Sequence, residues 1–219
     1  MEIQSFFPVW DRLTAAQREL ITSSAVRRNI KKGIVIQNGS TDYAGLLLIR
    51  HGQMRAHILS EKGREITLYR LFDRDICLFS VSCIIPSIQF EVSIEAEKDT
   101  ELWVIPAGVY KGIMEQSAPV ANFTNEIMCA RLSRIVSLIE QIMWKSVDKR
   151  LAAFLLEESA LEATNVLKLT HETIANHLGT AREVVTRTLR SFQRDSMVKL
   201  SRGTVEITDE EKLEPLRNT

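Results

Sequence analysis

Residues 180–203 bring together side chains that could bind a polyanion. The stretch holds six cations against two anions, although the formal net charge of the 219-residue chain is zero. The cations are Arg182, Arg187, Arg190, Arg194, Lys199 and Arg202, and the anions are Glu183 and Asp195. Lysine and arginine side chains neutralise the backbone phosphates of nucleic acids, and this attraction does not depend on base sequence. The stretch therefore predicts a local surface that contacts nucleic acid.

The residues that must position this charge, 170–192, predict a helix-turn-helix. Thr170 is suited to cap a first helix, and Gly179 can adopt the positive φ that ends it. Thr180 would then cap a second helix. The positions expected to face inward are small or apolar and recur at helical spacing; they are Ile174, Ala175, Leu178, Val184, Val185, Leu189 and Phe192. An unrelated pair of packed helices could imitate this pattern.

The second helix would present a polar face that begins with Arg182, Glu183, Thr186, Arg187 and Arg190. The N-terminal part of a recognition helix reaches base edges in the major groove. Glu183 and Arg187, one turn apart, are therefore candidate base contacts. Glu183 has a competing interpretation, because Thr180 and Glu183 have the spacing of a capping box. Residues 197–207 predict a hairpin, the wing, with Arg202 at its tip.

The rest of the chain predicts a β-rich domain followed by a long helix. The first ~30 residues look helical, with Thr14 as a cap. Short apolar or alternating runs between Asn29 and Ile105, separated by turn signals, are typical of a β-sandwich or barrel. No Pro or Gly interrupts the chain from Pro119 to about Ser146, which predicts one long helix.

A coiled-coil-type stripe runs along this long helix. Its apolar residues follow a 4-3-4-3 spacing and are Met128, Leu132, Ile135, Ile139 and Ile142. The stripe spans fewer than three heptads. It is thus compatible with a dimer interface and equally with an ordinary amphipathic helix that packs on its own domain.

On these motifs the chain resembles the Crp/Fnr family of bacterial transcription factors over nearly its whole length. Residues 178–187 match the family's recognition-helix pattern, an Arg-Glu pair followed by an Arg four residues after the Glu, and residues 63–71 resemble a hairpin of its effector domain. The resemblance implies an α+β fold with an N-terminal β-roll, a long dimerisation helix and a C-terminal winged helix-turn-helix. The implied domains are 1–116, 117–146 and 147–219.

The resemblance also implies a mode of action. The protein would be a homodimer that reads a palindrome of TGTGA-like half-sites in double-stranded DNA, and it would contact RNA polymerase if it is an activator. Arg182, Glu183 and Arg187 would read bases, since Arg pairs with guanine and Glu accepts from cytosine N4. Side chains expected to contact phosphates or position the helix are Thr170, Thr180, Thr186, Arg190 and Arg202.

Two departures from the family bear on the effector. The positions that bind ribose and phosphate in the cyclic-nucleotide branch hold Leu78-Phe79 and Phe90-Glu91 here. An acidic Glu91 without an arginine cannot neutralise a buried phosphate, so we expect an effector other than cyclic AMP. The chain has no cysteine before Cys77, which argues against the iron–sulfur cluster of the oxygen-sensing branch.

The segment 76–85 places Cys77 and Cys83 in an apolar stretch where relatives bind effectors. Both can be buried core thiols. Alternatively, the segment is a redox switch or lines an apolar pocket for a small lipid-like or haem ligand. The candidate pocket or redox residues are Cys77, Leu78, Phe79, Cys83 and Phe90. No cofactor can be named, and His51 and His57 are more readily explained as surface or core histidines than as haem ligands.

Several other classes are disfavoured. The chain lacks P-loop, G-x-S-x-G and H-E-x-x-H motifs, so we expect no enzyme; a cupin-like metal enzyme and a cyclic-nucleotide-binding regulatory module remain as alternatives. His171 and His177 lie six residues apart on different helix faces, and no metal site is expected. The number of cysteines is odd, and the sequence shows no signal peptide. No apolar run approaches the ~20 residues of a membrane span. These features predict a cytoplasmic protein without membrane association.

Overall fold

The computed structural model describes residues 2–37, 43, 45–61, 63–78 and 92–218. The chain forms two compact units. The first comprises Met1–Leu59 and Leu68–Ile135, and the second comprises Ser60–Thr67 and Val136–Thr219. The helix α3, Ala118–Trp144, begins in the first unit and ends in the second. Each unit is described below by itself.

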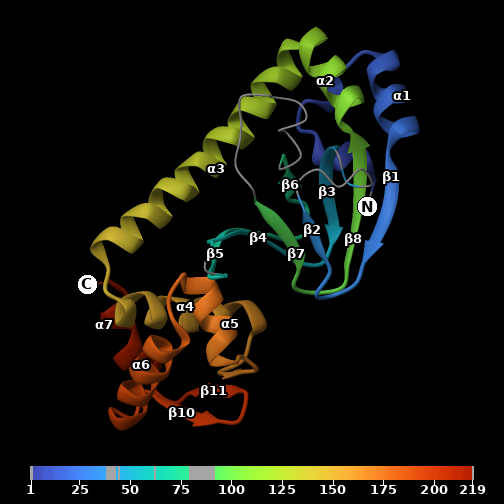
Figure 1. The fold of residues 1–219 in the computed structure, drawn as a ribbon. Coiled ribbons are helices and arrows are strands. Elements are labelled where there is room, and N and C mark those ends of the chain that lie inside the picture. Colours follow the sequence, from blue (N-terminus) through green and yellow to red (C-terminus); the bar gives the residue numbers. More distant parts are fainter. Residues whose placement is uncertain (1, 38–42, 44, 62, 79–91, 219) are drawn as a thin grey trace. The chain divides into compact units, whose positions relative to one another are not determined.

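The first unit is built around two antiparallel four-stranded sheets (Figure 1). One sheet has the order β1-β8-β3-β6, from Val26–Ile30, Thr100–Pro106, Gly45–His51 and Ile76–Cys77. The other has the order β2-β7-β4-β5, from Val35–Gln37, Ser93–Ala96, Met54–Leu59 and Glu65–Leu71. Apolar side chains of both sheets form one buried core, which confirms the predicted β-rich domain.

Strand β3 explains why one apolar run can serve two cores. Because successive side chains of a strand point to opposite faces, Leu47 and Ile49 join the core shared by the two sheets, whereas Leu46 and Leu48 pack against the helices. Gly45 begins the strand where it pairs with β8. A Cβ atom at Gly45 would lie 2.0 Å from the Ile105 carbonyl oxygen, so only glycine fits this position.

The N-terminal region is less helical than the sequence predicted. Short 3-10 turns at Ile3–Phe6 and Trp10–Arg12 precede α1, Ala15–Ser24, and β1 already begins at Val26. Thr14 does cap α1: its hydroxyl accepts the Gln17 N–H while the Gln17 side chain accepts the Thr14 N–H, a complete capping box. The helix ends at Ser24, where Ala25 adopts an extended conformation and donates its N–H to the Ile21 carbonyl.

Helix α2, Ala107–Gln116, and the first half of α3 cover the outer face of the β1-β8-β3-β6 sheet. Tyr110, Ile113 and Val120 are buried there, and the Tyr110 hydroxyl lies 2.7 Å from Thr124 Oγ1. The observed α3 confirms the long helix expected from Pro119 to Ser146 to within two residues. Among the described residues, no helix combines the length and the apolarity needed to cross a bilayer.

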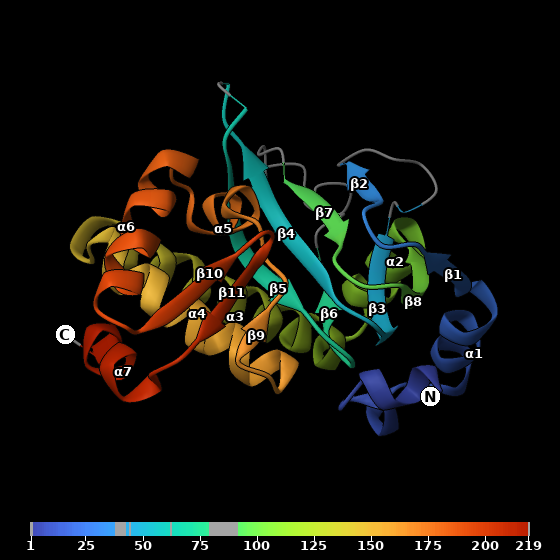
Figure 2. The ribbon, with the colours of Figure 1, turned by 90° about the horizontal axis from the view of Figure 1, so that it is seen from below.

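The second unit contains a small helical domain with a three-stranded sheet. Its elements are α4 (Val147–Glu162), β9 (Val166–Leu167), α5 (His171–Leu178), α6 (Arg182–Arg194), β10 (Val198–Ser201), β11 (Thr204–Ile207) and α7 (Glu210–Asn218). Figure 2 shows β10, β11 and β9 side by side, in that order. One apolar core joins all of these elements, and α6 contributes Val185, Leu189 and Phe192 to it. The α+β fold predicted from the sequence is thereby confirmed.

Candidate nucleic-acid interface

Helix α5 is fixed at both ends by hydrogen bonds. At its start Thr170 accepts the Thr173 N–H through its side chain at 3.0 Å, as predicted for a cap. At its end Gly179 has φ 64°, the left-handed conformation that glycine adopts without strain. From α4, Arg150 donates to the Leu178 carbonyl at 2.8 Å and so satisfies an acceptor that the helix leaves free.

The predicted role of Thr180 as the cap of the second helix is wrong. Helix α6 begins at Arg182 after Ala181, which has extended backbone and gives no side-chain cap. Thr180 instead completes the end of α5, because its N–H donates to the Ala175 carbonyl at 3.1 Å. Without Thr180 at the N-cap, Glu183 lies one position too early to complete a capping box. The interpretation that competed with base contact for Glu183 therefore falls away.

The buried face of α6 holds the helix against α5. Val185 and Leu189 are fully buried, and Phe192 is nearly so, together with Ile174 and Ala175 of α5. Small Ala175 permits the close approach of the two helices. The predicted inward positions are confirmed, except that Val184 is only half-buried. This packing fixes which side of α6 faces outward.

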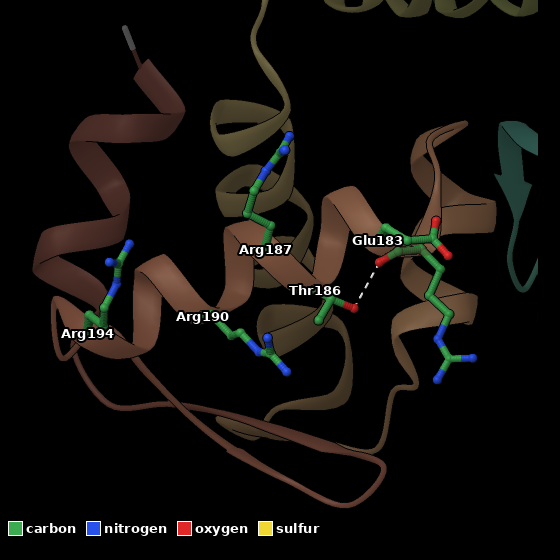
Figure 3. A pocket seen from close by; sticks show the side chains of 6 residues that line it. Glu183, Thr186, Arg187, Arg190 and Arg194 are labelled. Carbon is green, nitrogen blue, oxygen red and sulfur yellow. Dashed lines mark hydrogen bonds between the residues drawn. The ribbon is translucent and has the colours of Figure 1, made fainter.

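The outward face of α6 is a basic hollow of about 740 Å³ (Figure 3). It is lined by Arg182, Glu183, Thr186, Arg187, Arg190 and Arg194. Four of these share one helix face, because they follow one another at spacings of four, three and four residues; they are Glu183, Arg187, Arg190 and Arg194. In Figure 3 Arg187 and Arg190 leave the helix toward opposite edges of this face. The structure thus brings together the three predicted base readers and two of the predicted positioning residues.

Four of the five charged side chains that line this hollow have no partner among the described residues, and the fifth, Arg194, donates to Ser191 Oγ at 3.4 Å. Arg182, Glu183, Arg187 and Arg190 are exposed, and within the described part of the chain none of the four has a side-chain hydrogen bond or ion pair. The described lining of the hollow holds four guanidinium groups and one carboxylate, so its net charge is positive. Such a surface suits a polyanion that also offers hydrogen-bond donors and acceptors. Arg194, one of the six cations of residues 180–203, lies on the same face because it is one turn beyond Arg190.

Thr186 takes part in a contact that the sequence did not predict. Its hydroxyl donates to the Arg182 carbonyl at 2.9 Å and lies 2.8 Å from His171 Nδ1 (the first of these bonds is drawn in Figure 3). Burial lowers the pKa of His171 below its usual value, and the charges of Arg182 and Arg190 lower it further. A neutral imidazole therefore joins α5 to the base of the hollow. No sequence signal marks this pair, since fifteen residues separate them.

The wing is a hairpin that follows α6 in the chain and has a two-residue turn. Strands β10 and β11 pair from Val198 with Ile207 to Ser201 with Thr204, which leaves Arg202 and Gly203 as the turn. Gly203, the second residue of the turn, has φ 71°, whereas Arg202 does not have a positive φ; glycine is the residue that a type II turn favours at this position. Arg202 is exposed at the tip, where the sequence placed it.

The predicted effector segment lies only partly within the described residues. Cys77 is fully buried in β6, where it is paired with Leu47, and Leu78 is also buried. Beside them, burial raises the pKa of Tyr69, and the neighbouring Cys77 raises it further. Phe79, Cys83 and Phe90 lie outside the described residues. For Cys77 the structure agrees with the interpretation as a buried core thiol.

The predicted dimer residues of α3 differ in exposure. Leu132, Ile139 and Ile142 are exposed, by 61%, 49% and 43%, whereas Ile135 is half-buried. Met128 packs partly against the core of its own unit. Exposed large apolar side chains on the same stretch of helix are Val136, Met143 and Trp144. An apolar face of this size on a helix is typical of an interaction surface.

A capped short helix, a glycine turn, an exposed basic helix and a hairpin define a winged helix-turn-helix. Comparison with known proteins supports this class: residues 149–216 match the family described as the Crp-like helix-turn-helix domain. A crystal structure of a Eubacterium rectale protein assigned to the Crp/Fnr family of transcriptional regulators is similar along the chain. It is 61% identical, covers 98% of this chain and 100% of its own, and has a TM-score of 0.95.

Two more distant relatives extend the comparison. The cyclic AMP receptor protein of Thermus thermophilus is 24% identical over 95% of this chain and 96% of its own length. A Crp/Fnr-family regulator of the same organism has the same fold, with a TM-score of 0.72 at 20% identity over 89% of this chain and 99% of its own. The chain belongs to the Crp/Fnr family of DNA-binding transcriptional regulators, and the prediction that it is not an enzyme is confirmed by this membership.

Proposed function

We propose that this regulator reads DNA sequence with the outward face of α6, using Arg182, Glu183 and Arg187. The observation that carries the proposal is the basic hollow, in which Arg182, Glu183, Arg187 and Arg190 have no side-chain partner among the described residues. The N-terminal part of a recognition helix enters the major groove, and these three residues lie in the first two turns of α6. Arginine recognises guanine O6 and N7, and a glutamate accepts from cytosine N4.

Phosphate contacts would surround this centre. Arg190 and Arg202 are exposed on α6 and on the wing, and Thr170, Thr180 and Thr186 lie at the ends of α5 and on α6. Phosphate contacts fix the register of a protein on the duplex, whereas base contacts supply specificity. The Thr186 hydroxyl already donates to the Arg182 carbonyl, so it would assist a phosphate contact by ordering Arg182 and not by donating to the phosphate itself.

Two arginine variants distinguish base contacts from phosphate contacts. Arg187→Ala should weaken binding to a TGTGA palindrome by ~1–3 kcal/mol and relax specificity at one base pair, whereas Arg202→Ala should weaken binding to palindrome and scrambled duplex by the same factor. Fluorescence anisotropy measures both, with Arg28→Ala as a control, because Arg28 is an exposed arginine of β1. If both α6 and wing variants bind like the wild type, the placement of the recognition helix and wing is wrong.

We further propose that two copies of the chain associate through α3 and read two TGTGA-like half-sites. The apolar face that includes Leu132, Ile139 and Ile142 would be buried between the two helices. Sedimentation should show two copies of the 24.9-kDa chain for the wild type and one for Leu132→Glu. Leu20→Glu, at an exposed leucine of α1, is the matched control. A wild-type monomer, or a dimeric Leu132→Glu, would contradict the proposal.

The effector is proposed to be other than cyclic AMP. Support comes from the sequence, where Leu78-Phe79 and Phe90-Glu91 stand at the positions that bind ribose and phosphate in the cyclic-nucleotide branch. The name of the Thermus thermophilus relative applies to that protein, and at 24% identity it leaves the ligand of this chain open. A calorimetric titration with cyclic AMP should show no saturable heat, and saturable binding would overturn this part of the proposal.

A further inference from the structure

A basic groove of about 340 Å³ lies within the first unit, far along the chain from the DNA-binding helix. It is bounded by the N-terminal 3-10 segment, by the turn between β5 and β6, and by the first two-thirds of α3. Three arginines line it, Arg74 from the turn and Arg131 and Arg134 from α3. Among the described residues, Asp75 is the one carboxylate in its lining. The groove thus carries an excess of positive charge.

The three arginines have different surroundings. Arg131 is held in place, because its guanidinium donates to the Ile76 carbonyl at 3.0 Å, lies 3.6 Å from an Asp75 carboxylate oxygen and stacks 4.8 Å from the centre of the Tyr69 ring. Asp75 also accepts the Phe72 N–H at 2.9 Å, which fixes the turn. Arg74 and Arg134 are exposed and have no side-chain hydrogen bond or ion pair with any described residue. These two guanidinium groups are available to an anion.

The backbone of Arg74 gives an independent reason to regard its side chain as functional. Arg74 has φ 72°, and its N–H donates to the Ile49 carbonyl at 2.8 Å. Glycine occupies the left-handed region without steric cost, whereas a residue with a Cβ is strained there. Strain of this kind is concentrated at ligand sites. A long cationic side chain at a position suited to glycine points to a use for its charge.

The remaining lining of the groove is apolar except for Ser5, whose hydroxyl donates to the Glu2 carbonyl at 2.8 Å. Phe6 is buried below it, and Phe123 and Ile127 of α3 are half-buried at its wall. Its volume falls at the lower end of the range of small-molecule sites, roughly 300–1,000 Å³. We propose that the groove binds a small amphipathic anion, with a carboxylate or phosphate on Arg74 and Arg134 and an aromatic or aliphatic body against Phe6, Phe123 and Ile127.

This site is compatible with dimerisation through α3. At 3.6 residues per turn, the groove-lining positions 123, 127, 131 and 134 are centred roughly a third of a turn away from Leu132 and Ile139. The two faces of the helix can therefore be occupied at the same time. The inference goes beyond DNA recognition, and its test needs no DNA, so the two proposals can fail separately.

The test is a direct binding measurement on the full chain with simple probes. Phenyl phosphate and phenylacetate carry the same ring on different anionic groups, inorganic phosphate lacks the ring, and benzyl alcohol lacks the charge. Arg74→Gly and Arg134→Gln remove one cation each, and Arg74→Gly suits the positive φ, so loss of folding is not expected. Arg28→Gln removes an exposed arginine of β1 that lies outside the groove. Calorimetry or ligand-observed NMR follows the binding.

We expect saturable binding of phenyl phosphate, of phenylacetate or of both at millimolar concentration, and weaker binding of inorganic phosphate and benzyl alcohol. Arg74→Gly and Arg134→Gln should each reduce the affinity about tenfold, because a charge-assisted hydrogen bond is lost, while Arg28→Gln should leave it unchanged. The head group that binds more tightly identifies the anion as a phosphate or a carboxylate. The proposal is overturned if no probe binds saturably, if benzyl alcohol binds as tightly as the anions, or if the groove variants bind like the wild type.

Discussion

Substituting Thr170 and Thr180 by alanine, one at a time, separates two threonines that look alike in the sequence. The Thr170 side chain accepts the Thr173 N–H at 3.0 Å, and the loss of an N-cap costs typically ~1 kcal/mol. Thr180 takes part in the structure through its N–H, which donates to the Ala175 carbonyl and which alanine retains. We therefore expect less than about 0.5 kcal/mol for Thr180→Ala, as for an ordinary surface substitution.

Urea unfolding measures this difference. With a slope of about 2 kcal/mol/M, Thr170→Ala should lower the midpoint by about 0.5 M, while Thr180→Ala should leave it nearly unchanged. Hydrogen exchange of the Thr173 amide gives a local control, because that amide loses its acceptor in Thr170→Ala alone. Equal shifts for both variants would show that Thr180 does cap α6. Glu183 would then have the position that completes a capping box with Thr180, and it would not be free to contact a base.

Two further predictions concern pH and a close backbone approach. The lowered pKa of His171 means that the folded state keeps the imidazole neutral to a lower pH than the unfolded state does; its contribution to stability is therefore present above the unfolded pKa near 6.5 and is lost as the pH falls below that value. His171→Gln should lose less stability than the wild type between pH 7.5 and 5.5 in urea titrations, and parallel losses would contradict the assignment. Gly45→Ala should destabilise by about 2–3 kcal/mol or more, since its Cβ would meet the Ile105 carbonyl. Gly112→Ala in α2, where a Cβ meets nothing within 4 Å, should stabilise the protein by about 0.5–1 kcal/mol. Thermal melts measure both variants, and a change of Tm in the same direction for the two would contradict the prediction.

The sequence predicted those features that depend on local chemistry. Periodicity placed the inward residues of α5 and α6, glycine marked the left-handed end at Gly179 and the wing turn at Gly203, and the absence of Pro and Gly gave the length of α3. Each of these follows from neighbouring residues and from the dihedral angles that they permit. The boundaries 1–116, 117–146 and 147–219 remain a prediction, whereas the compact units divide α3 itself after Ile135.

The features that the sequence did not predict depend on tertiary contacts, or on which of two neighbouring residues becomes the cap of a helix. Thr180 can cap a helix, but its N–H donates to the end of α5, and Ala181 is the N-cap of α6 instead. His171 and Thr186 meet only because the two helices pack. Arg74 and Arg134, sixty residues apart, line one groove only after the turn between β5 and β6 has packed beside α3. No spacing rule connects residues so distant in the chain.

The central claim is that the face of α6 recognises a specific DNA sequence. The most direct measurement is fluorescence anisotropy of the reduced wild-type protein, without added ligand, on a labelled TGTGA palindrome and on a scrambled duplex. Salt should be held at ~150 mM, because non-specific binding is steeply salt-dependent. The account predicts tighter binding to the palindrome, by at least about tenfold, and a loss of this preference in Glu183→Gln. Equal affinity for the two duplexes, unchanged by Glu183→Gln, would contradict it.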